Sequence, residues 1–312
     1  MNMKFTIAIP AYKSLYLEEA IDSILGQSYS DFELLILDDA SPYNLPCIVS
    51  KYDDPRIRFY RNERNVGALN VVDNWNRCLE LAKGEYIICM GDDDCLCPDS
   101  LAGYSGYIDR YPECNIFHGA TEMIDEASRM INIQEARPEH ESVYSMAWHR
   151  MTRKREQFIG DFVFRTEVLR AAGGFYFLPL AWASDDISAF RIAMSGGIVN
   201  TSEIVFRYRV NSINITSTGS VKHKLEAIVQ EKQWYIDNLL VERELSPLDD
   251  KYRLLISCNL DRCFKRKIMS TCADGFRTSF WSMLKDIRRY DLNFKEVCMV
   301  MILGWSRRFG IR

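Results

Sequence analysis

The stretch Tyr86-Ile87-Ile88-Cys89-Met90-Gly91-Asp92-Asp93-Asp94 decides the fold, because an apolar run of strand length ends abruptly in three carboxylates. A continuous apolar run predicts a strand covered on both faces, as in a parallel sheet. Three adjacent aspartates repel one another unless a cation or hydrogen-bond donors offset their charge. Mg²⁺ or Mn²⁺ would suit such oxygen ligands. The alternative is a solvated acidic turn.

Outward from this stretch, short apolar runs and helical spacing alternate at residues 5–9, 15–25, 32–37, 57–60, 66–81 and 86–90. Such alternation predicts an α/β fold, Rossmann-like, with a mostly parallel central sheet. Ligands of these sheets bind beyond the carboxyl ends of the strands. The polar clusters that follow the strands at Pro10, Asp38 and Asp92 should therefore meet at one edge. Gly84, which follows the helix at 66–81, stands where a helix-capping glycine is expected.

The middle of the chain is less regular. Residues 120–134 fit either a hairpin or a long connection. Further on, the pattern predicts a strand turning into a helix, a second helix and a last strand, at 162–170, 183–194 and 204–210. Helical patterns dominate from Lys222. The change in charge and periodicity predicts two parts, an α/β domain at 1–215 and a basic helical region at 216–312.

The charge is unevenly distributed along the chain. Residues 251–312 hold 14 Lys/Arg and 5 Asp/Glu, a net +9 that leaves −13 for the rest of the chain at a total of −4. This asymmetry argues against a nucleic-acid binder and favours contact of the tail with an anionic membrane surface. A solvated helical face is the other interpretation. The tail is also amphipathic, which suits a membrane interface and equally a helix packed on its own domain. Its apolar residues are Phe280, Met283, Leu284 and Ile287, with Trp281 at the edge of their face, and the run 297–305.

Composition also bears on the compartment. The ten cysteines have irregular spacing and form no paired zinc motif. The first residues lack an apolar leader, and no stretch reaches the roughly 20 apolar residues of a membrane-spanning helix. We therefore expect reduced thiols and a cytoplasmic protein, with the inner face of the membrane as a peripheral location.

Several short motifs occur together in one order: Pro10-Ala11-Tyr12, Asp38-Asp39-Ala40-Ser41, Asn65-Val66-Gly67, Ala82-Lys83-Gly84-Glu85-Tyr86-Ile87, and Asp92-Asp93-Asp94 with Leu96 and Pro98-Asp99. In order and spacing this set resembles glycosyltransferase family 2, which has the GT-A fold. The resemblance implies inverting transfer from a nucleoside-diphosphate sugar, a UDP-sugar being favoured, to a hydroxyl of a saccharide acceptor. If the basic tail lies at the membrane, a lipid-linked saccharide is the expected acceptor, and the expected role is in cell-surface polysaccharide synthesis.

The resemblance also implies roles for individual residues. The nucleotide would be held by Pro10, Tyr12, Asp38, Asp39, Asn65 and Asp92. Mn²⁺ or Mg²⁺ would be bound by Asp93, with Asp94 as an alternative ligand or a support behind it. This chain departs from the family at Gly91, where many members have an aspartate, and at Asn211, where a metal-binding histidine is common.

The resemblance places the catalytic base at the start of the helix predicted at 183–194. Asp185 is the favoured candidate, Asp186 is the second, and a purely capping role for Asp185 is the third interpretation. The acceptor hydroxyl needs such a base because it is a poor nucleophile near neutral pH. Arg209, at the end of the last strand, could donate to a phosphate. Among the four histidines, His118 is the one to test near the donor sugar.

Two other functions compete with sugar transfer. A nucleotidyltransferase on a similar sheet would need a Gly-rich loop and a lysine near the first strand, where only Lys13 is available. A non-catalytic sugar-nucleotide-binding protein would need no base.

Overall fold

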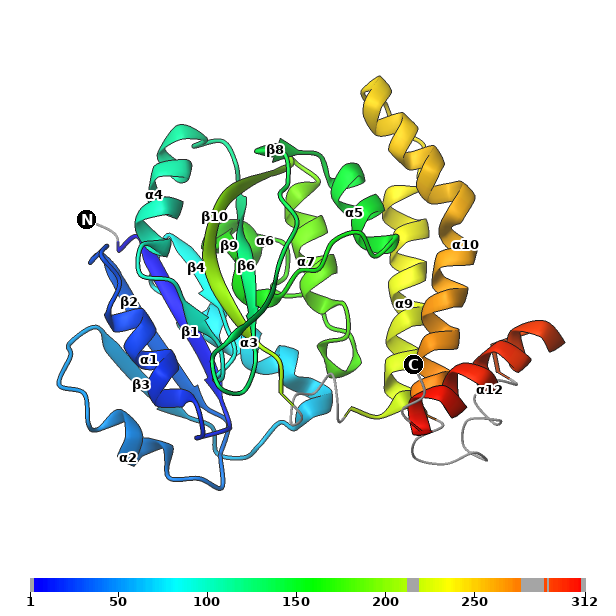
Figure 1. Ribbon diagram of the computed structural model, residues 1–312. Coiled ribbons are helices and arrows are strands. Elements are labelled where there is room, and N and C mark those ends of the chain that lie inside the picture. Colours follow the sequence, from blue (N-terminus) through cyan, green and yellow to red (C-terminus); the bar gives the residue numbers. More distant parts are fainter. Residues whose placement is uncertain (1–2, 212–218, 276–288, 291, 310–312) are drawn as a thin grey trace.

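A single ten-stranded sheet forms the centre of the molecule, in the order β3-β2-β1-β4-β9-β6-β10-β5, with β7 on β6 and β8 on β10. Helices cover both of its faces (Figure 1). The computed structural model describes residues 3–211, 219–275, 289–290 and 292–309. Two large apolar clusters fill the space between the sheet and its helices. The predicted α/β architecture is confirmed.

The first half of the sheet is parallel, as predicted. Its strands are β1 (Phe5–Ala11), β2 (Phe32–Asp38), β3 (Ile57–Arg61) and β4 (Tyr86–Cys89). The connecting helices are α1 (Leu17–Leu25), α2 (Leu45–Val49) and α3 (Val71–Leu81), the last preceded by the short η1 (Ala68–Asn70). All residues of β1, β2 and β4 except Pro10 are buried, which explains why these strands are apolar without alternation.

The second half mixes strand directions. Its strands are β5 (Cys95–Leu96), β6 (Ile116–Ile124), β7 (Met130–Ile133), β8 (His140–Glu141), β9 (Phe162–Arg165) and β10 (Ile198–Arg209). β9 runs antiparallel to both β4 and β6, whereas β10 runs parallel to β6. β7 pairs antiparallel with the end of β6, so the ambiguous residues 120–134 form a hairpin.

The helices of this half are α4 (Ser100–Arg110), α5 (Val143–Met151), α6 (Thr166–Ala171) and α7 (Ser184–Ala193), with the short turns η2 (Ile159–Asp161) and η3 (Pro179–Ala181). The predicted strand-to-helix change at 162–170 is confirmed by β9 and α6. The last strand begins six residues before its predicted start, because irregular pairing between Thr201 and Phe206 interrupts the pattern.

Three helices follow the sheet: α9 (Val221–Leu239), α10 (Pro247–Gly275) and α12 (Phe294–Phe309). They lie on one side of the molecule (Figure 1). Tyr235 of α9 packs its ring against Phe190 of α7 and Phe264 of α10, with centroids 5.9 and 5.4 Å apart. The helical region therefore shares one apolar core with the sheet domain, and the division near residue 215 stays a prediction.

The amphipathic stretch containing Phe280, Trp281, Met283, Leu284 and Ile287 lies outside the described residues. Within the described part of the chain, no helix has the length and apolar character that spanning a bilayer requires.

Two sequence-based details are wrong. The helix expected from Val66 begins later, because Gly67 has φ of 79° and the Val66 amide donates to Asp39. Gly84 does not cap that helix, since Ala82 ends it in an extended conformation. Instead, Gly84 lies against the backbone of β1, and its N–H donates to Thr6 Oγ1 at 2.8 Å.

The contact around Gly84 leaves no room for a side chain. A Cβ there would approach the Thr6 nitrogen to 2.3 Å and the Phe5 carbonyl carbon to 2.4 Å, and both are backbone atoms that cannot yield. The same corner buries Glu33 of β2, which accepts from Thr6 Oγ1 and from the Lys83 amide, each at 2.7 Å. The clash therefore falls on a buried polar junction between the two central strands.

We expect Gly84→Ala to destabilise the fold by about 1–3 kcal/mol or more, because overpacking here must displace a central strand. Gly106 in α4 is the matched control, since a Cβ there meets nothing within 4 Å. Gly106→Ala should be neutral or stabilising by roughly 0.5–1 kcal/mol. Urea unfolding of the two variants measures both effects, and equal stabilities would contradict this account.

Candidate active site

Most of the polar residues predicted to meet do lie together, at the carboxyl ends of β1, β2, β4 and β10. The Asp92 Oδ2 atom accepts the backbone N–H groups of Tyr12 and Lys13, at 2.7 and 2.6 Å. The Ser41 hydroxyl, after β2, donates to the Tyr12 carbonyl at 2.6 Å. The predicted common edge is therefore present. The Tyr12 side chain is exposed beside it, where it can receive a planar ring.

The acidic pair after β2 is buried and shapes its loop. Asp38 accepts the Ser41 amide at 2.8 Å and forms an ion pair with Arg61. Asp39 accepts from the Asn62 side chain at 2.8 Å and from the Val66 amide at 3.1 Å. These contacts rigidify the edge of the sheet, and contact of either aspartate with a base stays a prediction.

Asn65 belongs to the same loop, and its side-chain amide donates to the Asp39 carbonyl at 3.0 Å. Sequence reasoning missed Asn62, which also donates to Asn74 of α3 at 2.9 Å. Buried asparagines on a loop carry no pattern of their own, so only the fold reveals them.

The three aspartates after β4 are 4–6% exposed, so the solvated-turn interpretation is wrong. Donors from elsewhere in the chain offset their charge. The Lys13 Nζ atom lies 2.6 Å from Asp93 Oδ2 and 3.4 Å from Asp92 Oδ1. Asn211 Nδ2 donates to Asp93 Oδ2 at 2.6 Å, and the Arg209 amide donates to Asp94 Oδ1 at 2.9 Å. Lys13 and Asn211 thus belong to the site, although neither was predicted to hold the aspartates.

Burial and mutual repulsion perturb these carboxyl groups. Burial raises the pKa of Asp92, against the opposing effect of the Lys13 ammonium. Burial and the neighbouring Asp93 charge raise the pKa of Asp94 well above its ordinary value. A divalent cation would relieve both effects, since it supplies positive charge to oxygen ligands in a poorly solvated place. The donor set therefore fits a hard cation, held by Asp93 with Asp94.

The described side chains do not by themselves supply a complete coordination sphere for a metal ion. Among the described residues, no three His, Cys, Asp or Glu side chains come together in a metal-binding arrangement. The remaining ligands of a cation at Asp93 would have to be water or oxygens of a bound substrate, as is usual for Mg²⁺.

Gly91, the departure from the family pattern, is explained by crowding. A Cβ at this position would come within 2.8 Å of Asp94 Oδ2 and 2.9 Å of Asp93 Oδ1. The turn folds its own carboxylates back over the glycine, so a larger residue would displace them.

Arg209 lies beneath the aspartate turn and is fully buried. Its Nε donates to the Asp93 carbonyl at 2.8 Å, and Nη1 donates to Ser128 Oγ at 2.9 Å. Its guanidinium also pairs with Glu19 at 2.8 Å and stacks on the Tyr16 ring. The observed contacts are those of a support for the turn. A phosphate contact stays a prediction, and it would need the side chain to leave these partners.

Asp185 lies in the first turn of α7 and follows a strained segment. Leu180, Ala181 and Ala183 have φ of 62°, 52° and 70°, a region that non-glycine residues rarely occupy. The N-cap residue is Ala183, and no side chain caps the helix there. Asp185 is therefore not the N-cap residue, although as a first-turn carboxylate it accepts a backbone N–H of that turn, from Asp186 at 2.9 Å. The sequence does not predict this strain, because leucine and alanine have no preference for positive φ.

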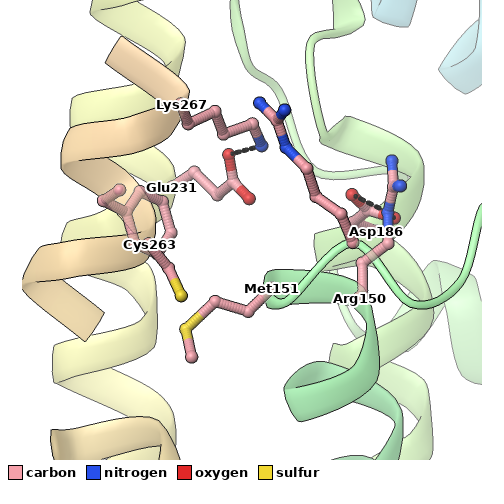
Figure 2. A pocket seen from close by; sticks show the side chains of 8 residues that line it. Arg150, Met151, Asp186, Glu231, Cys263 and Lys267 are labelled. Atoms are coloured by element: carbon pink, nitrogen blue, oxygen red, sulfur yellow. Dashed lines mark hydrogen bonds and ion pairs between the residues drawn. The ribbon is translucent and has the colours of Figure 1, made fainter. Parts of the chain in front are cut away.

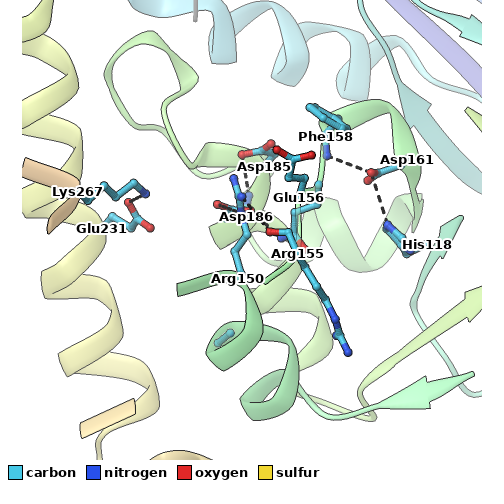
Figure 3. A network of polar contacts seen from close by, with 12 residues as sticks. His118, Arg150, Arg155, Glu156, Phe158, Asp161, Asp185, Asp186, Glu231 and Lys267 are labelled. Carbon is cyan, nitrogen blue, oxygen red and sulfur yellow. Dashed lines mark hydrogen bonds and ion pairs between the residues drawn. The ribbon is translucent and has the colours of Figure 1, made fainter. Parts of the chain in front are cut away.

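Asp185 and Asp186 have different surroundings (Figure 3). Asp186 is 1% exposed, and both of its oxygens accept Arg150 Nε at 2.8 and 2.9 Å. Gln157 also donates to it at 2.6 Å. Asp185 is half-buried and accepts the backbone N–H of Asp186 at 2.9 Å. Asp186 is thus held by its partners, whereas Asp185 is the more exposed of the two, and its role as the base stays a prediction.

Surrounding protein and the Asp186 charge raise the pKa of Asp185 to about 8, although Arg150 opposes the shift. Asp161 also raises it, so the two carboxylates lie close enough to interact. Asp161 ends η2 just before β9, which is antiparallel to β4 and so starts near the carboxyl end of β4. The first turn of α7 therefore lies toward the carboxyl end of β4, the strand that the aspartate turn follows.

His118 lies inside the sheet domain and is 1% exposed. Its Nε2 lies 3.5 Å from Asp161 Oδ2, and its ring packs on Phe162. Burial, helped by Arg137, lowers the pKa of His118 and favours its neutral form. A role near a donor sugar stays untested.

Comparisons with known proteins agree with this geometry. The family model described as "Glycosyl transferase family 2" matches residues 6–172. A putative colanic acid biosynthesis glycosyl transferase, WcaA of Escherichia coli K12, is 38% identical over 104 residues, which are 32% of this chain and 36% of that protein. The GalNAc(5)-diNAcBac-PP-undecaprenol beta-1,3-glucosyltransferase of Campylobacter jejuni is 31% identical over 102 residues, 32% of each chain. The alignments thus span about a third of these relatives.

Solved structures extend the likeness to the whole fold. TarS 1–349 of S. aureus in complex with UDP-GlcNAc aligns with a TM-score of 0.66 at 16% identity, covering 99% of this chain and 92% of that one. The mannosyltransferase PcManGT of Pyrobaculum calidifontis, in complex with GDP-Man and Mn²⁺, aligns with a TM-score of 0.56 at 16% identity, covering 99% and 88%. The sheet is therefore that of a GT-A glycosyltransferase, and with more than half of its length matched, the chain belongs to glycosyl transferase family 2.

Proposed function

We propose that the protein is an inverting glycosyltransferase that moves a sugar from a nucleoside diphosphate, with UDP-sugars favoured, to a saccharide hydroxyl in cell-surface polysaccharide synthesis. The observation that carries the proposal is Asp185, a half-buried carboxylate whose helical turn lies toward the carboxyl end of β4, the strand that the buried aspartate turn follows. A single displacement with inversion needs one base on the acceptor side and charge stabilisation on the leaving-group side. Asp185 can supply the base, and the aspartate turn can hold the cation that stabilises the leaving group.

In this reaction the acceptor oxygen attacks the anomeric carbon while the bond to the diphosphate breaks. Asp185 takes the proton of the acceptor hydroxyl, and the bonding electrons leave with the nucleoside diphosphate. A divalent cation held by Asp93 and Asp94 would stabilise the negative charge of the leaving diphosphate. The exposed Tyr12 ring would receive the nucleobase, and the loop formed by Asp39 and Asn65 would border it.

Two features speak against the competing functions. A protein that only binds sugar nucleotides gains nothing from a strained turn that presents an aspartate of raised pKa. A nucleotidyltransferase would need Lys13 directed at a phosphate, but its ammonium is engaged by Asp92 and Asp93.

Asp185→Asn should lower kcat by about 10²–10⁴-fold, because the amide cannot accept the acceptor proton. Donor affinity, measured by calorimetry, should stay unchanged, since the substitution keeps the size of the side chain and changes a group assigned to the acceptor rather than to the nucleotide. Full activity in this variant would exclude Asp185 as the base. Loss of donor binding together with activity would indicate a structural role instead.

The pH dependence of kcat/KM gives an independent measure of the base. Asp185 works only when ionised, so a pKa of about 8 predicts a rate that rises with pH and is half-maximal near pH 8. Stopped assays with a single donor between pH 5.5 and 9.5 would record this profile. A rate already at its plateau at pH 6 would contradict the assignment.

Asp93→Ala should weaken or abolish Mn²⁺ binding, because it removes the carboxylate to which the cation is assigned. Mn²⁺ binding can be followed by electron paramagnetic resonance without any turnover. Asp109→Ala in α4 removes the same charge from a side chain that is 73% exposed, and it should leave Mn²⁺ affinity unchanged. Equal Mn²⁺ binding by wild type and Asp93→Ala would place the cation elsewhere.

We also propose that the acceptor is a lipid-linked saccharide met at the inner face of the membrane. The name of the Campylobacter jejuni relative describes such an acceptor. In this chain, α12 packs on α10 through the buried Val300 and turns apolar side chains to solvent, namely Phe294, Met299, Ile302, Leu303 and Trp305. An apolar helix face within a basic tail suits an anionic bilayer surface.

The double variant Ile302→Gln/Trp305→Gln should therefore lose most of its co-sedimentation with vesicles containing phosphatidylglycerol. Leu248→Gln/Leu254→Gln on α10 is the control, because these leucines are also exposed, 61% and 52%, but lie on a different helix. Equal vesicle binding by both double variants would exclude α12 as the contact surface.

A further inference from the structure

Two ion pairs lie near the first turn of α7, one in the sheet domain and one in the helical region. Arg150 of α5 contacts Asp186 of α7, and Lys267 of α10 pairs with Glu231 of α9 at 2.5 Å. A cavity of about 70 Å³ separates the two pairs, with Met151, Cys263 and Phe264 also in its wall (Figure 2). It has room for a few water molecules.

This arrangement gives the Arg150 side chain a defined position. Its Nε donates to both Asp186 oxygens, and Nη1 donates to the Arg155 carbonyl at 3.3 Å. Burial by itself lowers the pKa of Arg150, but Asp186 and Asp185 outweigh this effect and keep it charged. Glu231 forms an ion pair with Lys267, and its charge adds a smaller favourable effect on Arg150 than Asp186 does.

We propose that Arg150 is a positioning residue of the transfer reaction, which holds the first turn of α7 through Asp186 and so fixes and polarises Asp185. The proposal rests on the function of Asp185 proposed above. Asp185 and Asp186 are adjacent on one helical turn, so a clamp on the second determines where the first can lie. The positive charge of Arg150 also offsets the repulsion between the two carboxylates.

Charged groups from several elements lie around Asp185 and its Asp186–Arg150 neighbours (Figure 3). Asp186 on α7, Arg150 on α5 and Asp161 on η2 act on Asp185 itself, Glu156 is on the loop before η2, and Glu231 on α9, paired with Lys267 on α10, acts on Arg150. Asp186 and Asp161 disfavour the ionised form of Asp185, whereas Arg150 favours it. Arg150 and Asp186 thus act on the base in opposite directions, although both belong to one ion pair.

Because Arg150 and Asp186 have opposite effects on the pKa of Asp185, pH profiles can distinguish a positioning role of Arg150 from a merely structural one. Arg150→Gln and Asp186→Asn break the same pair, and each should lower the thermal stability. We expect the pH profile of kcat/KM to move to higher pH in Arg150→Gln and to lower pH in Asp186→Asn. At pH 7, Arg150→Gln should lose at least about tenfold in kcat/KM, with the donor dissociation constant unchanged.

Arg150→Lys keeps the charge and loses the two-oxygen contact, so it should lower kcat while leaving the pH profile in place. If Arg150→Gln does not fold, this variant and Asp186→Asn still carry the test.

Arg155→Gln is the matched control. It breaks another buried ion pair, in which Arg155 Nη1 lies 2.5 and 2.6 Å from the Glu141 oxygens, and it keeps the Arg155 backbone carbonyl that accepts from Arg150. Its pH profile should match that of the wild type while its stability falls.

Profiles that stay in place, or move in the same direction, in Arg150→Gln and Asp186→Asn would overturn the proposal. A fully active Asp185→Asn would instead overturn the proposed base, so the two failures are distinguishable.

Discussion

The burial of three adjacent carboxylates at the end of β4 is the constraint on which the rest of the site depends. Asp92, Asp93 and Asp94 can be buried together because donors arrive from two other places in the chain: Lys13 after β1, and Arg209 and Asn211 at the end of β10. Arg209 holds the turn from below, and Gly91 leaves the space into which two of the carboxylates fold. The contacts that offset the charge of this turn therefore connect the parallel half of the sheet, through Lys13, with the mixed half, through Arg209 and Asn211.

A second acidic site is built by different means. Asp185 is presented by backbone strain at Leu180, Ala181 and Ala183 and is held through its neighbour Asp186. Strain of this kind persists only where the surroundings fix it, and it concentrates at functional sites. In the proposed reaction the two acidic sites therefore have different roles: the first binds positive charge, and the second accepts a proton.

The parallel half of the sheet could be predicted because its strands are buried on both faces and the aspartate turn follows one of them directly. The mixed half of the sheet could not be predicted, since the direction of β9 depends on partners far away in the sequence, in β4 and β6, such as Tyr86 opposite Arg165. The predicted residues of the nucleotide edge do come together, but Lys13, Asn62 and Arg150 were missed as members of their sites. A lone lysine, asparagine or arginine carries no spacing signal, and its role arises from contacts that only folding creates.

The central claim is that this edge of the sheet binds and activates a sugar nucleotide. It is tested most directly by the release of nucleoside diphosphate from a panel of UDP-, GDP- and dTDP-sugars, with and without Mn²⁺ or Mg²⁺, supported by calorimetric binding of the same nucleotides. The account predicts that one class of donor binds and is turned over only with the cation. If none of these nucleotides binds, with or without the cation, the site is not that of a glycosyltransferase and the account is contradicted.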